Sequence, residues 1–140
     1  MTQEDKELLL KDLCARLPYG VKLYRTYGEC VSLELRSVDV GNDKLVFYTY
    51  KGDGLEICDT DTIERFGQLK YKPYLFPLSS MTEEQKEEYH NNCNVGLDRQ
   101  GNEVYYDCAE SIDWLNAHFF DYRGLIEKGL AIDATGLGIY

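Results

Sequence analysis

The stretch VKLYRTYGECVSLELRSVDVGNDKLVFYTYKGDGLEICDTDTI, residues 21–63, decides the fold because apolar and polar side chains alternate along it. Leu33 and Leu35 are two positions apart, so they must point to the same side of a strand. Turn signals built on glycine, asparagine and aspartate divide the stretch, as expected between antiparallel strands. The strands predicted by this pattern cover residues 21–27, 30–40, 44–50 and 55–63. We expect them to form an antiparallel meander.

The residues before this stretch predict an amphipathic helix. Leu9, Leu13 and Leu17 recur at helical spacing, so they share one face. Thr2 suits the N-cap, and Pro18 ends the helix. A short, twisted meander must be covered or must close on itself. We therefore expect an α+β fold: an N-terminal helix covering an antiparallel β-meander or small SH3/Sm-like barrel, followed by a C-terminal helical unit.

The middle of the chain shows weaker patterns. Residues 64–78 have no clear period, and Pro73 and Pro77 interrupt their apolar end, so we expect irregular structure there. Thr82 and Gln85 have the spacing of a capping box, which predicts the start of a helix. The residues that follow are nearly all polar, and such a short, solvated helix connects other elements rather than supporting them.

The last third of the chain predicts a hairpin and then a helix. Residues 93–107 alternate on both sides of a turn at residues 100–102. Asp107 and Glu110 have capping-box spacing before the helix. The predicted buried stripe of this helix consists of Cys108, Ile112, Leu115 and Phe119.

We expect Asp121 to cap a final short helix that Gly129 closes, and residues 133–140 to form a loose tail. A chain of this length fits a single domain over residues 1–140. A division into two lobes stays open, with the helix and β module in 1–78 and the hairpin and helical unit in 79–140. The side chains expected to share the core are Leu9, Leu13, Leu33, Leu35, Val46, Tyr48, Ile112, Leu115 and Phe119.

Charge disfavours one class of partner. Fifteen basic side chains face 25 acidic ones, for a net charge of −10. Phosphate binding depends on clustered Lys and Arg, so direct nucleic-acid binding is not expected. The N-terminus lacks the pattern of a signal peptide, and no stretch is apolar enough to span a membrane. Together with five cysteines that form no close pair, this favours reduced thiols in a cytoplasm, which the family resemblance below implies to be bacterial.

No catalytic, metal or cofactor site is expected. His90 and Cys93 have ligand-like spacing, but the second pair, Cys108 and His118, is ten residues apart. On a helix that spacing separates two side chains by about 15 Å, too far to share one ion. We interpret the cysteines as buried, small apolar residues and His118 as a hydrogen-bonded packing residue.

A binding surface is the better hypothesis. Trp114, His118 and Tyr122 recur at helical spacing beside the buried stripe, and Arg123 follows them. Tryptophan, tyrosine and arginine are the residue types enriched at binding hot spots. The alternative is that this line packs against the β module and joins the two lobes.

Three segments carry a family resemblance: LLLKDLCARLPYGVK (8–22), KPYLFPLSSMTEEQ (72–85) and DWLNAHFFDYRGLIEKGLAI (113–132). With them the chain resembles an uncharacterised family of small proteins encoded in Bacteroidales phages and prophages. The β-rich middle matches only in general character. The resemblance implies a phage-derived accessory protein, and it brings no catalytic residue, ligand or partner with it.

The leading hypothesis for function is a non-enzymatic protein that binds a host or phage protein, with no cofactor. The alternative is a small-molecule or nucleotide-binding protein that sequesters a signal, with aromatic stacking groups and cations such as Arg25, Arg36 or Arg123. DNA mimicry is a narrower form of the first idea. It would use the acidic residues of 83–88, although a solvated helix explains these equally well.

Overall fold

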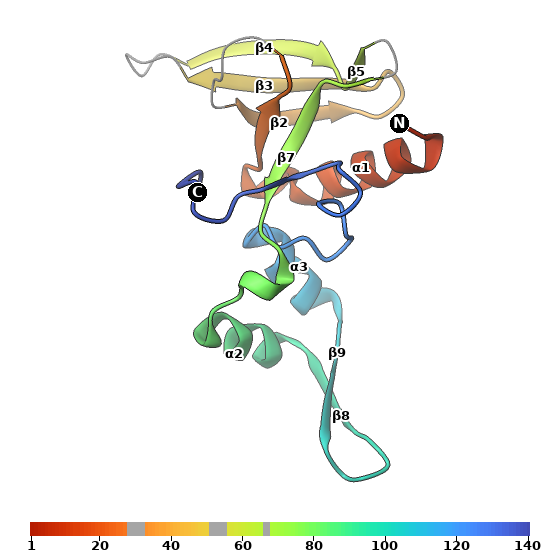
Figure 1. Cartoon of the computed structure of the whole chain (residues 1–140), viewed down its shortest axis with the longest axis vertical. Coiled ribbons are helices and arrows are strands. Elements are labelled where there is room, and N and C mark those ends of the chain that lie inside the picture. The colour runs from red at the N-terminus through yellow and green to blue at the C-terminus, as the bar shows by residue number, and fades with distance from the viewer. Residues whose placement is uncertain (28–32, 51–55, 66–67) are drawn as a thin grey trace.

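The computed structural model describes residues 1–27, 33–50, 56–65 and 68–140, and it confirms an α+β fold with an N-terminal helix (Figure 1). Its helices are α1 (Gln3–Arg16), α2 (Glu83–Asn92) and α3 (Ala109–Ala117), with 3₁₀ turns at Leu17–Tyr19 and Leu78–Ser80. Its strands are β1 (Lys22–Arg25), β2 (Leu33–Asp39), β3 (Lys44–Tyr50), β4 (Glu56–Thr62), β5 (Glu64–Arg65), β6 (Gln68–Leu69), β7 (Tyr71–Leu75), β8 (Asn94–Leu97), β9 (Glu103–Tyr106) and β10 (Ile132–Asp133).

The predicted meander is present as β1, β2, β3 and β4, each antiparallel to the next. The main sheet is larger than the meander because β7 pairs antiparallel with β1 and β10 pairs parallel with β7. Its strand order is β10-β7-β1-β2-β3-β4. A register shift between Leu35 and Ser37 marks a bulge in β2, so the inward-facing position moves from Leu35 to Val38.

The sheet also closes on itself at one end. After β4 the chain forms the small β5–β6 hairpin and returns as β7. Lys70 N donates to Ile63 O at 3.0 Å, and Thr26 N donates to Lys70 O at 2.9 Å. Hydrogen bonds therefore link β4 through this hairpin to β7 and β1. The order of the main sheet is open, with β10 and β4 at its edges, so these bonds give a partly closed barrel at one end only; α1 covers the sheet, and we call the sheet together with α1 the barrel end (Figure 1).

The prediction that residues 64–78 are irregular was wrong, because Tyr71–Leu75 is an inner strand of the sheet. Proline is normally excluded from such a strand because it has no N–H to donate. Pro73 faces Leu23 in the ladder. Since Thr26 and Lys70 are hydrogen-bonded, alternation makes the Leu23–Pro73 pair a non-hydrogen-bonded one. The missing N–H therefore costs no bond to β1.

The core prediction holds for α1 and β2 and fails at several later positions. Leu9, Leu13, Leu33 and Leu35 belong to one buried cluster, as expected. In β3 the buried residue is Leu45, while Val46 is half-buried, so the strand faces were assigned one residue out of phase. Ile112 and Phe119 are half-buried, Leu115 is buried outside the main cluster, and the side chain of Tyr48 lies outside the described residues.

The chain after α3 also departs from prediction. Asp121 accepts hydrogen bonds from Leu125 N and Ile126 N, but the segment forms turns rather than a helix. Residues 133–140 are not a loose tail. The Tyr140 hydroxyl donates to Tyr74 O and accepts from Lys22 N, and its ring stacks 3.9 Å from that of Phe119. Apart from Asp133, which ends β10, this segment contains no strand. The ring of Phe119 and the carbonyl of Tyr74, which are far from it in the sequence, hold it in place.

Figure 1 shows an elongated molecule in which β7 connects two ends. The sheet and α1 lie at one end. The short helices α2 and α3 lie at the other, and the β8–β9 hairpin projects beyond them. The capping box at Thr82 and Gln85 is confirmed at the start of α2. At α3 the pair is Cys108 and Ser111 instead of the predicted Asp107 and Glu110, since Ser111 Oγ accepts from Cys108 N.

Candidate binding surface

The four residues predicted to form a binding surface lie in two places. α3 ends before His118, and Phe119 has a positive φ of 61° that turns the backbone away from the helix axis. Trp114 and His118 stay together, with ring centroids 4.1 Å apart. Tyr122 and Arg123 lie beyond the turn and contact α1 side chains. The helical spacing that united the four residues therefore stops at His118.

Arg123 belongs to a buried ion network. Its Nη1 donates to Asp12 Oδ1 at 2.8 Å, and Arg16 Nε donates to Asp12 Oδ2 at 2.9 Å. Arg16 Nη2 also donates to Phe120 O at 2.7 Å. Asp12 and Arg16 are fully buried, and they tie α1 to the segment after α3. Asp12 and Arg16 have the helical spacing that places them on the same face of α1 as Leu9 and Leu13. This spacing was the signal in the sequence for their burial.

His118 lines a hollow of about 400 Å³ beside the end of α3. The other walls include the rings of Phe76, Phe119 and Tyr140. His118 Nδ1 lies 2.8 Å from Trp114 O, so in a neutral imidazole this nitrogen carries the proton and Nε2 is the acceptor. Aromatic rings thus form a large part of this wall, and Ser80, Gln85 and Thr135 add polar side chains beside His118.

The β8–β9 hairpin exposes apolar side chains to solvent. Leu97 is 70% exposed, Val95 is 56% exposed and Tyr106 is 53% exposed. Val95 is paired with Tyr105, and Leu97 with Glu103, so these four side chains share one side of the hairpin. We call Val95, Leu97, Glu103 and Tyr105 the hairpin face. Tyr106 lies on the opposite side, over Gly96, where an added Cβ would meet the Tyr106 ring at 2.9 Å.

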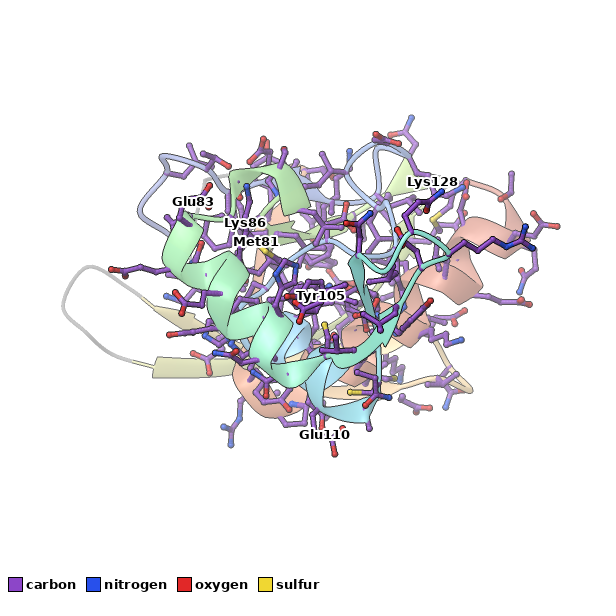
Figure 2. All side chains as sticks on the ribbon, turned by 90° about the horizontal axis from the view of Figure 1, so that it is seen from below. Met81, Glu83, Lys86, Tyr105, Glu110 and Lys128 are labelled. Atoms are coloured by element: carbon purple, nitrogen blue, oxygen red, sulfur yellow. The ribbon has the colours of Figure 1, made fainter. Side chains whose placement is uncertain are left out.

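The hairpin face borders an acidic helix. The Tyr105 ring stacks on His90 of α2, with ring centroids 3.9 Å apart and planes 6° apart. Figure 2 shows Tyr105 between the hairpin and α2. A hollow of about 440 Å³ lies there, lined by Glu83, Glu84, Lys86, Glu87, His90, Asn91 and Tyr105. The surroundings of the exposed aromatic ring are therefore acidic.

The base of the hairpin is anchored by polar contacts. Asp107 Oδ1 accepts hydrogen bonds from the hydroxyls of Tyr89 and Ser111, which joins α2 to α3. Cys108 Sγ donates to Asn92 O at 3.0 Å. Burial, together with the hydrogen bond to Asp107, raises the pKa of Tyr89, so this hydroxyl stays protonated at neutral pH. The hairpin consequently projects in a defined direction from a fixed base.

Sequence reasoning predicted this hairpin but did not identify it as a surface. The available signal was that Val95 and Leu97 face one side while Val104 and Tyr106 face the other. A two-stranded hairpin carrying apolar residues on both sides needs two covering layers. Only α2 and α3 follow or precede it closely, and both are short. Exposure of one side was therefore readable from the pattern.

The histidines and cysteines were considered in the sequence as metal ligands or as buried packing residues. Within residues 1–27, 33–50, 56–65 and 68–140, no three His, Cys, Asp or Glu side chains lie close enough to hold a metal ion. Cys14 is exposed, and Cys93 and Cys108 are half-buried, so the prediction of buried cysteines was wrong for these three. Cys30 and the side chain of Cys58 lie outside the described residues. None of the described helices has the length and apolar character required to cross a membrane.

Comparison of the chain with protein-family models, curated proteins and solved structures found no match.

Proposed function

We propose that this chain is a non-enzymatic accessory protein of phage or prophage origin that binds a host or phage protein in the bacterial cytoplasm through its hairpin face. The observation that carries this proposal is the exposure of Leu97 and Val95 on a projecting hairpin. Scattered apolar side chains are ordinary at protein surfaces, but neighbouring ones on a protruding element mark interaction sites. The resemblance to phage-encoded proteins supports the proposed origin.

The composition of the face also suits a protein partner. Tyr105 offers a large apolar ring with a polar end, a type enriched at protein interfaces. The anchored base fixes the hairpin before binding, so little ordering cost remains when a partner docks. The acidic side chains of α2 form a polar rim beside this apolar centre.

The test compares two matched double variants of the full chain. Val95→Thr with Leu97→Ser removes the apolar groups of the hairpin face. Val40→Thr with Leu137→Ser removes side chains of similar exposure, 56% and 53%, far from the hairpin. Tagged proteins are used to capture partners from a Bacteroidales lysate, and an enriched protein is then purified and titrated by calorimetry. We expect its Kd to rise about ten-fold for the hairpin variant and to stay unchanged for the control. Equal binding by both variants would refute this function.

A second candidate is small-molecule binding in the hollow beside His118. Its volume of about 400 Å³ falls in the usual range for ligand pockets, and aromatic rings form a large part of its wall. No Lys or Arg is among the described residues that line it, and Arg123 is engaged by Asp12. A neutral, planar ligand fits these walls better than a nucleotide phosphate does.

Thermal shift against a panel of nucleosides, nucleotides and neutral aromatic metabolites tests this candidate. A ligand at one hundred times its Kd adds about 2.7 kcal/mol of stability. We expect stabilisation by neutral aromatic compounds that is reduced in the His118→Ala variant. A panel without any stabilising compound would count against it.

A further inference from the structure

The backbone of β8 has an unused edge. Asp98 N donates to Asn102 O across the turn at 2.9 Å. Because N–H and C=O groups alternate along an antiparallel strand, those of Gly96 point into the hairpin while those of Val95 and Leu97 point outward. In the described part of the chain, β8 pairs with no strand other than β9. The outward groups of Val95 and Leu97 therefore offer a ladder to a further strand.

Apart from its short length of four residues, this edge lacks the features that natural proteins use to protect an exposed strand. Such edges commonly carry lysine, proline or an inward-pointing charge. β8 instead reads Asn94, Val95, Gly96 and Leu97, and the two residues with outward backbone groups also have highly exposed aliphatic side chains. Main-chain bonds and apolar contacts would thus be available to the same added strand.

Charge identifies the kind of strand that fits. α2 carries Glu83, Glu84, Glu87 and Glu88 against a single lysine, and Glu103 stands on the hairpin face itself. The whole chain has a net charge of −10. A second copy of this chain would bring the same acidic surface against itself, whereas a basic segment is attracted to it.

We propose that β8 binds an extended segment of a partner protein by strand addition, with apolar side chains on Val95 and Leu97 and with Lys or Arg two residues away from them, on the same side of the hairpin, toward Glu103 and the acidic residues of α2. This inference rests on the proposed function and adds the binding mode and the chemistry of the partner. Its specificity comes from alternate residues, since side chains of an added strand point to opposite sides of the hairpin.

The probe is a fluorescein-labelled peptide of about seven residues in which Lys, Val, Val and Lys occupy every second position, with Ser between them, so that all four side chains point to the same side. Two control peptides replace Lys by Glu or carry N-methyl groups on alternate residues, which removes donors from one edge. Binding to the full chain is measured by fluorescence anisotropy, and protection of the Val95 and Leu97 amides by NMR hydrogen exchange. We expect the Val–Lys peptide to bind at least about ten times more tightly than either control and to protect both amides.

Two variants at position 97 separate the contribution of the backbone hydrogen bonds from that of the side chain. Leu97→Ser and Leu97→Pro both remove the apolar group, but only proline also removes the outward N–H, which the hairpin itself does not use. We expect Leu97→Pro to bind the peptide about ten times more weakly than Leu97→Ser, with circular dichroism confirming that both remain folded. Equal affinities for the two variants, or for the methylated and unmethylated peptides, would overturn strand addition.

Failure of this inference is distinguishable from failure of the proposed function. A partner captured through Val95 and Leu97 whose affinity is indifferent to Leu97→Pro leaves the function intact and refutes strand addition. Light scattering of the free protein tests whether a second copy of this chain occupies the edge instead. A dimer that Leu97→Pro dissociates would assign the edge to a second copy of this chain and overturn the choice of a basic partner.

Discussion

The barrel end and the hairpin end of this protein are built in opposite ways. At the barrel end, α1 contributes Leu9, Leu10 and Leu13 to a single buried cluster with the sheet. At the hairpin end, Leu115 of α3 is buried, but α2, β8 and β9 have no buried residue. Hydrogen bonds and aromatic stacking hold α2 and the hairpin instead. Apolar groups thus stabilise the fold at one end and remain available for a partner at the other.

The largest expected effect breaks the buried ion network at the barrel end. Asp12→Ala leaves Arg16 buried without its carboxylate, which typically costs about 3–5 kcal/mol. Urea denaturation measures this loss. Arg123→Ala should cost less, because that side chain is partly exposed and Asp12 keeps Arg16. A double variant, Asp12→Leu with Arg16→Met, should recover part of the stability. A loss under about 1 kcal/mol for Asp12→Ala would show that the network does not hold the two segments together.

The second-largest loss of stability should come from a cavity in the leucine cluster. Leu13→Ala removes a side chain that is 1% exposed, and such truncations cost about 2–5 kcal/mol. The matched variant at the hairpin end is Leu97→Ala, which should change stability by no more than about 0.5 kcal/mol. Chemical denaturation of both proteins gives the contrast directly. Similar losses for the two would mean that Leu97 is packed in solution.

Acid sensitivity should arise at the closed end of the barrel. Burial alone would raise the pKa of Asp61, but hydrogen bonds from Lys70, Tyr71, Thr62 N and Tyr27 outweigh it, so the pKa is lowered. A carboxylate with a lowered folded pKa contributes stability above its unfolded pKa of about 3.9 and loses that contribution as pH falls below it.

Asp61→Asn therefore has two expected results. It should cost about 1–3 kcal/mol at pH 7 through lost and unsatisfied hydrogen bonds. It should also weaken the dependence of stability on pH below about 4. Denaturation curves between pH 2 and pH 7 test both, with Asp113→Asn, at an exposed position of α3, as the control. If wild type and Asp61→Asn lose stability in parallel on acidification, this carboxylate does not control acid unfolding.

The smallest effect on stability belongs to the hairpin face. Val95→Thr with Leu97→Ser should shift the free energy of unfolding by about 0.5 kcal/mol or less, since both side chains are already solvated. The same variant should weaken partner binding, so stability and binding separate at this end. Thermal denaturation is sufficient for the first part. A large destabilisation would contradict the contrast between the two ends.

Much of the barrel end was predictable because its signals are local. Alternation in residues 21–63 predicted the meander, and leucine spacing with Thr2 predicted α1. The bulge in β2 and the burial of Leu45 instead of Val46 were not predictable, since a one-residue change of phase leaves an alternating pattern nearly unchanged. In the candidate site, the hairpin was located correctly as an element, while the predicted helical line from Trp114 to Tyr122 extended beyond the end of α3.

The sequence by itself determined the fold class, the meander, the first helix and the acidic character of the surface, because each follows from neighbouring residues or from composition. Only the tertiary structure decided that β7 joins the sheet despite Pro73, that Tyr140 holds the final segment, and that Asp12 and Arg16 are buried. It also decided which side of the hairpin is uncovered. These features depend on contacts between residues far apart in the chain, and a local pattern does not specify which distant surface will meet it.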